Sequence, residues 1–214
     1  ATQEGICKHE VVEFDASYDD DRVTAHVFLP LDAHPPFQTV VFFPGGGCDN
    51  QSVFPKNAKT HAVFPELLAS GRAVIWPVYF GTSERGGGGP DIPGRADLTE
   101  ERIRQVKDIC RVVDYIEERE DLDEHKLAYL GTSYGALSAP LCLAIEHRFN
   151  TAVMYNGGLP PWDYDRRVDP VHFAPRMTTS ALMINGKDDD IFPLATSQEP
   201  LFDLLGTPES DKDH

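Results

Sequence analysis

Short apolar runs alternate with amphipathic stretches along the chain. Runs rich in β-branched and aromatic residues, typical of buried strands, occur at residues 39–43, 73–79, 127–130, 151–155 and 180–184. Apolar residues at helical spacing occur at residues 61–70, 103–116 and 202–205, and in the stretch after Gly135. Residues 11–14 and 22–29 alternate around a turn of three aspartates, which predicts an N-terminal hairpin.

This order of strands and helices predicts an α/β fold: a doubly wound, mostly parallel sheet with antiparallel N-terminal strands. The clearest helix, around residues 103–116, carries one apolar stripe. We expect that stripe to face the core and the charged remainder of the helix to face solvent.

One apolar run leads into the pentapeptide G-x-S-x-G at residues 131–135. A strand that turns sharply into a helix forces the middle residue, Ser133, into a strained conformation, and glycines flank it because a Cβ would collide with neighbouring backbone. The amide of Tyr134, at the positive end of the following helix, can donate to an oxyanion. The pentapeptide alone is a weak signal, but the strand before it and the helix after it favour a nucleophile elbow.

A serine nucleophile needs a base to take its proton and a carboxylate to orient that base. In hydrolases with this elbow the acid follows the nucleophile along the chain. Asp188, Asp189 and Asp190 follow the apolar run 180–184, and catalytic groups gather at the carboxyl ends of strands. A solvated acidic turn is an alternative for this cluster, while a calcium loop lacks the required acidic spacing.

These motifs resemble the α/β-hydrolase superfamily, in particular serine esterases, dienelactone hydrolases and prolyl-peptidase-like enzymes, over nearly the whole chain. The resemblance implies that Asp189 is the acid, because the acid of that family lies three residues after a glycine and four before a proline, here Gly186 and Pro193. For Asp188 and Asp190 we expect solvated positions.

The loop at residues 44–47 resembles the H-G-G-G motif of esterases and lipases, with a proline where the family often has histidine. The resemblance implies that Gly46 supplies the second oxyanion donor, and it places Gly47 next to the substrate. An ordinary flexible turn is the alternative for such a segment taken alone.

Residues 159–176, rich in proline, aromatic and charged side chains, are expected to form an insert over the active-site edge of the sheet. Inserts at this place shape the substrate pocket in the family, so Trp162 is a candidate pocket residue. An insert that packs on itself explains the composition equally well. Three short segments, at 148–150, 173–176 and 206–208, resemble hydrolase modules attached to bacterial serine/threonine kinases.

The chain has eight histidines, and only the last residue, His214, follows Asp189. Residues 207–213 contain no apolar run, so His214 is interpreted as the residue that enters the last strand. We therefore expect a single domain, residues 1–214, that lacks the last strand, the last helix and the catalytic histidine at its C-terminus. Such a chain should hydrolyse esters poorly or not at all. A base role for His172, in the insert, would break the usual order.

Composition narrows the classes of partner. With 35 acidic and 19 basic residues the formal net charge is −16, which repels phosphate backbones and anionic lipid, so nucleic acid is not expected as a partner. The chain contains no uninterrupted run of about 18 apolar residues, so the sequence predicts no membrane span. The four cysteines show no C-x-x-C spacing, which argues against a zinc site or a redox pair. Reduced cysteines fit a cytoplasmic protein, so that location is predicted.

The sequence therefore predicts a serine hydrolase that cleaves carboxylic esters without a metal or organic cofactor, with a small-molecule ester or amide as substrate. Covalent linkage to other domains in a longer chain is expected from the kinase-module resemblance. A catalytically silent ligand-binding or regulatory module is one alternative. A prolyl-peptidase-like serine peptidase is the other.

Overall fold

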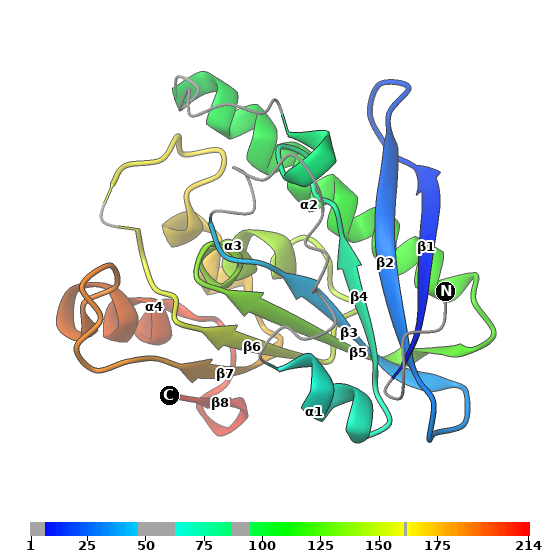
Figure 1. Cartoon of the computed structure of the whole chain (residues 1–214). Coiled ribbons are helices and arrows are strands. Elements are labelled where there is room, and N and C mark those ends of the chain that lie inside the picture. The colour runs from blue at the N-terminus through cyan, green and yellow to red at the C-terminus, as the bar shows by residue number, and fades with distance from the viewer. Residues whose placement is uncertain (1–6, 47–62, 87–94, 161) are drawn as a thin grey trace. The chain divides into compact units, whose positions relative to one another are not determined.

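The computed structural model describes residues 7–46, 63–86, 95–160 and 162–214 (Figure 1). The chain divides into two compact units. The first unit comprises Ala1–Phe42, Gly47–Pro90 and Lys107–Leu127, and the second comprises Phe43–Gly46, Asp91–Val106 and Ala128–His214. None of the helices in the described ranges is both long enough and apolar enough to cross a membrane.

Four strands and a short helix build most of the first unit (Figure 1). The strand order is β1-β2-β4-β3. The β1–β2 and β2–β4 pairs are antiparallel, whereas β3 and β4 are parallel. The elements are β1 (Cys7–Asp15), β2 (Arg22–Pro30), β3 (Phe37–Phe43), α1 (Phe64–Ala69) and β4 (Ala73–Pro77).

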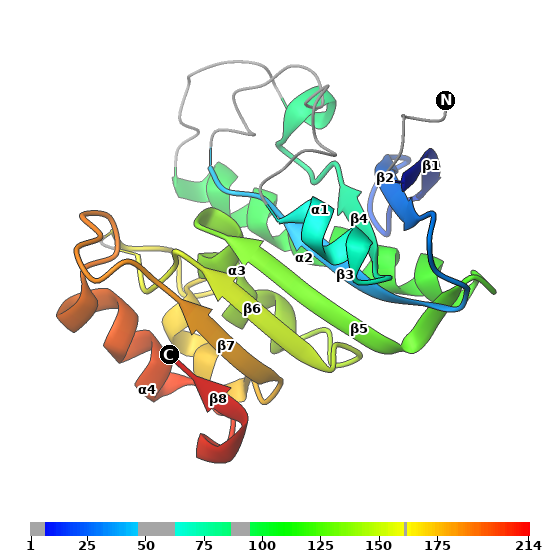
Figure 2. The same ribbon diagram turned by 60° about the horizontal axis from the view of Figure 1, so that its bottom comes forward.

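The second unit contains parallel strands in the order β5-β6-β7-β8, side by side in Figure 2. Helix α2 (Arg95–Glu117) and strand β5 (Leu122–Thr132) each contribute residues to both units. The remaining elements are α3 (Tyr134–Leu143), β6 (Thr151–Tyr155), β7 (Ser180–Ile184), α4 (Glu199–Leu204) and β8 (Lys212–Asp213).

The described part of the chain thus forms the predicted fold class, an eight-stranded mixed sheet with antiparallel N-terminal strands. The two-residue strand β8 pairs with β7 just before His214, two residues earlier than the sequence analysis expects the last strand to begin. The predicted insert at 159–176 contains two short 3₁₀ helices, Pro170–His172 and Ala174–Arg176.

Strand β7 corrects one expectation from the sequence. Its apolar run was predicted to be buried, but successive side chains of a strand point to opposite faces. Ala181 and Met183 are buried, whereas Leu182 and Ile184 are 38% and 43% exposed. An unbroken apolar run does not distinguish a strand buried on one face from a strand buried on both.

Helix α2 corrects a second expectation, because part of its polar side is buried. Arg102, Gln105 and Asp108 are 1%, 2% and 0% exposed. The apolar stripe itself is confirmed, since Val106, Ile109, Val113 and Ile116 are buried. Apolar spacing alone could not show that polar positions next to the stripe are also enclosed.

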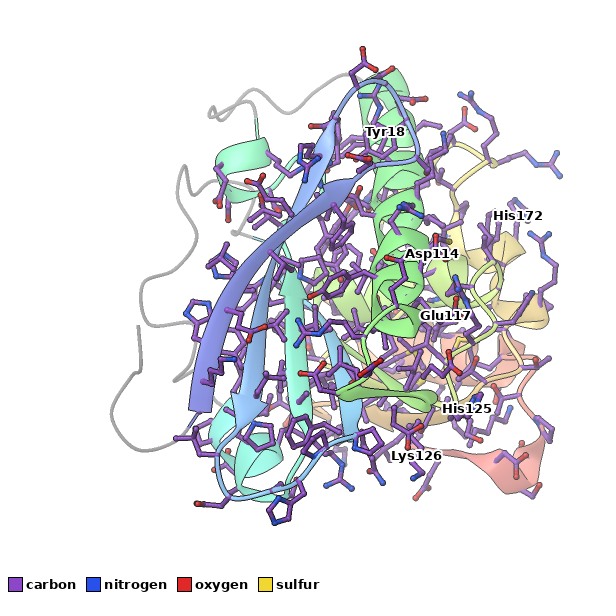
Figure 3. All side chains as sticks on the ribbon, turned by 90° about the vertical axis from the view of Figure 1, so that its right-hand side faces the viewer. Tyr18, Asp114, Glu117, His125, Lys126 and His172 are labelled. Atoms are coloured by element: carbon purple, nitrogen blue, oxygen red, sulfur yellow. The ribbon has the colours of Figure 1, made fainter. Side chains whose placement is uncertain are left out.

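Asp108 links three segments of the first unit. Its carboxylate accepts hydrogen bonds from the Tyr18 hydroxyl (2.7 Å), the Phe80 amide (2.8 Å) and Arg85 Nη1 (2.7 Å). Tyr18 lies at the turn between β1 and β2, beside α2 (Figure 3). The same arginine donates to Asp21, 2.7 Å away, so the buried charges are paired.

We expect Asp108→Ala to lower the free energy of unfolding by about 3–5 kcal/mol, because it leaves the Arg85 guanidinium buried without this carboxylate. Urea unfolding measures the change. Asp114→Ala is the control: this residue of α2 forms a half-exposed pair with Arg111 and should cost about 1 kcal/mol or less (Figure 3). Equal losses in the two variants would contradict the role of the buried pair.

Candidate active site

Ser133 lies at the turn between β5 and α3. Its backbone has φ 51° and ψ −106°, in a region that residues other than glycine rarely occupy. The Ser133 amide donates to the Tyr155 carbonyl at the end of β6 (2.8 Å), and its carbonyl accepts from the Leu137 amide (2.9 Å). The strained strand-to-helix turn predicted from G-x-S-x-G is therefore present.

Both glycines of the motif are required by close backbone contacts. A Cβ at Gly131 would lie 2.5 Å from the Gly135 carbonyl, and a Cβ at Gly135 would collide with the Phe43 carbonyl oxygen. The Gly135 amide also donates to the Pro44 carbonyl over 3.1 Å. These contacts hold the end of β3 against the elbow.

The glycine loop that follows β3 therefore lies beside Ser133. A Cβ added at Gly45 would be 3.3 Å from the Cβ and 3.9 Å from the Oγ of Ser133, and one added at Gly46 would be 4.0 Å from the Tyr134 Cβ. Gly47 lies outside the described residues. The candidate oxyanion residues Gly46 and Tyr134 are thus neighbours, and their role stays a prediction.

The side chain of Tyr134 is anchored to helix α2. Its hydroxyl donates to Gln105 Oε1 (3.0 Å), and Gln105 Nε2 donates to Glu101 Oε1 (3.2 Å). The ring of Phe43 contacts it edge-on, with centroids 5.9 Å apart. Because the residue after Ser133 is fixed at its far end, the first turn of α3 is held in place at the elbow.

Asp189 lies in the turn after β7. Its Oδ1 accepts the amides of Ile191 (2.8 Å) and Phe192 (2.9 Å), while Oδ2 accepts no hydrogen bond from the described residues. The buried Gln198 fixes this loop by donating to the carbonyls of Gly186 and Phe192. Asp189 is partly buried, whereas Asp188 and Asp190 are exposed. The exposure agrees with the solvated positions expected for those two.

The carboxyl ends of β5, β6 and β7 are joined in the second unit. The Asn156 amide donates to the Ile184 carbonyl (2.8 Å), and Asn185 Nδ2 donates to the Gly157 carbonyl (2.6 Å). Asn156 has φ 52°. Sequence reasoning missed these residues, although a signal exists: β6 and β7 are each followed directly by Asn-Gly.

The described histidines do not complete a triad. None of them makes a hydrogen bond with Ser133 or Asp189 in the described part of the chain. The ring of His214 lies against Phe202, with centroids 5.6 Å apart, and its amide donates to Asp213 Oδ1 (3.0 Å). His172 is exposed at the molecular surface (Figure 3).

The candidate pocket residue Trp162 is 49% exposed. It contacts Tyr164 edge-on, with centroids 6.3 Å apart. Tyr164 in turn contacts the buried Arg102 of α2, which sequence reasoning assigned to the solvated face. No motif marks this arginine; its only sequence signal is its place, one helical turn before the buried Val106.

The fold is that of the α/β hydrolases, as comparison with solved structures shows. A cold-adapted esterase from an Arctic intertidal metagenomic library matches with TM-score 0.74 and 18% identity over 99% of this chain and 85% of that chain. A putative dienelactone hydrolase from Klebsiella pneumoniae subsp. pneumoniae matches with TM-score 0.69 and 19% identity, over 96% and 83%.

The acylaminoacyl peptidase of Pyrococcus horikoshii matches 98% of this chain with TM-score 0.71 and 15% identity, although only 36% of that chain is covered. No family model and no curated protein sequence matches the chain. These likenesses establish the fold. The narrower resemblance to modules attached to kinases receives no support from them.

We expect Gly135→Ala to lower the free energy of unfolding by about 1–3 kcal/mol, because the new Cβ must displace the Phe43 carbonyl. Thermal unfolding followed by circular dichroism checks this. Gly186→Ala is the control, since a Cβ at that position meets nothing within 4 Å, and we expect little change. A Gly135 variant as stable as the Gly186 variant would contradict the close contact.

Proposed function

We propose that this protein is a serine hydrolase that cleaves carboxylic esters, with Ser133 as nucleophile. The observation that carries the proposal is the strained turn that projects Ser133 beside the glycine loop. Two further observations support the proposal. The Asp189 turn follows β7, which runs parallel to β6, and the fold is shared with esterases.

In the proposed reaction Ser133 Oγ attacks the ester carbonyl carbon and gives up its proton to a base. The amides of Tyr134 and Gly46 stabilise the negative charge that develops on the carbonyl oxygen. The alcohol leaves with the proton, and water then hydrolyses the acyl-enzyme by the same steps in reverse. Gly47 and Trp162 are proposed to contact the substrate.

The base is a histidine in this proposal, oriented by Asp189. One carboxylate oxygen of Asp189 is fixed by two amides, which leaves Oδ2 to accept the ring N–H of the base. Because no described histidine bonds to Ser133 or Asp189, we propose that the 214-residue chain hydrolyses esters slowly. The second candidate is a non-catalytic module that binds a ligand at the elbow. It too is favoured by the finding that no described histidine bonds to Ser133 or Asp189.

A fluorophosphonate probe tests the nucleophile. We expect an adduct that forms slowly on Ser133, because no described histidine activates the hydroxyl. Mass spectrometry after prolonged exposure should locate it, and Ser133→Ala should lose it. Ser210→Ala, an exposed serine whose hydroxyl bonds locally to Asp211, should keep the adduct. Slow release of p-nitrophenol from p-nitrophenyl acetate should remain, about 10³- to 10⁴-fold above water, as in triads that lack one member. Absence of labelling at Ser133 would favour the non-catalytic module.

A backbone substitution tests the oxyanion donor. Gly46→Pro removes one N–H and should slow p-nitrophenyl acetate hydrolysis about 10²- to 10³-fold relative to the wild-type chain, if Gly46 donates as proposed. Gly46→Ala keeps the amide, and its Cβ would meet only Tyr134 Cβ at 4.0 Å, so its rate should stay near that of the wild type. Equal rates for the proline and alanine variants would refute the assignment of Gly46.

A further inference from the structure

Arg102 of α2 contacts both the elbow and the insert at 159–176. The residue is 1% exposed, and its Cζ lies 5.4 Å from the centre of the Tyr134 ring and 4.4 Å from the centre of the Tyr164 ring. Tyr134 directly follows Ser133, and Tyr164 belongs to the insert. The face of an aromatic ring attracts a guanidinium, and the attraction is stronger where water is excluded. The arginine therefore joins two segments that are far apart in sequence.

The two halves of the insert are held differently. The second half is anchored by burial, because Val168, Pro170 and Ala174 are buried and its first 3₁₀ helix packs against α3. Residues 162–167, called the outer arm below, form no helix or strand, and all of them except Tyr164 are exposed. The contact of Tyr164 with Arg102 is thus the place where the outer arm meets a buried side chain.

The arginine matters more to the outer arm than to the elbow. Tyr134 has a second anchor, since its hydroxyl donates to Gln105 Oε1 over 3.0 Å. The ring contacts of Tyr164 in the described part of the chain are with Arg102 and with Trp162, the latter edge-on at 6.3 Å between centroids. Arg102 therefore acts on Trp162 through Tyr164.

We propose that Arg102 is a positioning residue that ties the outer arm to the elbow and so sets how tightly an apolar acyl chain binds at Trp162. This inference rests on the proposed ester hydrolysis, in which Trp162 contacts the substrate. Trp162 is 49% exposed, so its ring offers apolar surface to a ligand. Because Arg102 acts on the arm and not on the reacting atoms, its loss should raise KM for long acyl chains and leave kcat almost unchanged.

The charge of Arg102 distinguishes this role from simple packing. An arginine stays protonated at physiological pH. Its Nε, Nη1 and Nη2 atoms meet no acceptor in the ranges that the structure describes, so the two ring faces are the partners of the cation there. Lysine keeps a cation that ring faces attract, whereas methionine fills a similar volume without charge. Arg102→Lys should therefore preserve the tie and Arg102→Met should lose it.

Trypsin cleavage tests the tie without any catalysis by the protein. Arg166 and Arg167 are exposed in the outer arm, so local opening of the arm presents their peptide bonds to the protease. We expect Arg102→Met to speed cleavage there about tenfold, as loss of a buried cation–π contact would, and Arg102→Lys to stay within about threefold of the wild type. Cleavage after Lys187, exposed in the turn after β7, should not change.

Substitutions of Tyr164, which is only partly buried, repeat the test without altering the buried arginine. Tyr164→Leu removes the ring and should speed cleavage of the arm, whereas Tyr164→Phe keeps the ring face and should not. Arg111→Gln is the control: it removes the same charge from α2 where it bonds to Asp15 and Asp114. Unchanged cleavage of the arm in Tyr164→Leu, or equal acceleration after Lys187, overturns the proposal. Cleavage as fast in Arg102→Lys as in Arg102→Met overturns the role of the charge.

Ester kinetics test the effect on the substrate. For p-nitrophenyl hexanoate we expect Arg102→Met and Tyr164→Leu to raise KM about tenfold and to keep kcat within about twofold, while KM for p-nitrophenyl acetate stays near the wild-type value. A lower kcat with unchanged KM would place the effect at the elbow and overturn the proposal. If Ser133 is not labelled and neither ester is hydrolysed while Arg102 still protects the arm from trypsin, the ester chemistry fails and the tie stands.

Discussion

The close backbone contact between the end of β3 and the start of α3 is the constraint on which the candidate site depends. Gly135 lies so near the Phe43 carbonyl that any side chain there would collide with it, and its amide bonds to the Pro44 carbonyl. The contact fixes where the glycine loop begins relative to Ser133. Two segments far apart in sequence therefore meet with little freedom, which is what a preorganised oxyanion site requires.

Main-chain hydrogen bonds also connect the elbow to the turn that carries the candidate acid, Asp189. The Ser133 amide bonds to the last residue of β6, and the residue after β6 bonds to the last residue of β7, from which the Asp189 turn departs. Each strand end is thus positioned by its neighbour through main-chain hydrogen bonds. The side chain of Gln198 donates to the Gly186 carbonyl in the loop after β7, and that of Asn185 donates to the Gly157 carbonyl in the loop after β6. The loops carry the candidate chemistry, while the parallel sheet sets their spacing.

Local pattern predicted those parts of the molecule that local physics determines. The bounds of β6 and β7 match the apolar runs, and the elbow follows from two glycines spaced around a serine. Contacts with residues distant in sequence could not be predicted from local pattern. Helical spacing identified the apolar residues of α2, but it gave no sign that Gln105 would bond to Tyr134. The choice of Asp189 among three aspartates came from family resemblance, because adjacent identical side chains carry no distinguishing local signal.

Helix α2 also shows how the chain accommodates buried polar side chains. Three polar side chains on its enclosed side are almost fully buried, and two of them are satisfied: Asp108 by three donors, and Gln105 by a hydroxyl and a carboxylate. The chain can therefore pair buried polar groups on this helix. Arg102, the third, contacts two aromatic faces and no acceptor in the described ranges. Because the rings of Tyr134 and Tyr164 face this cation, it ties the elbow and the 159–176 segment to α2.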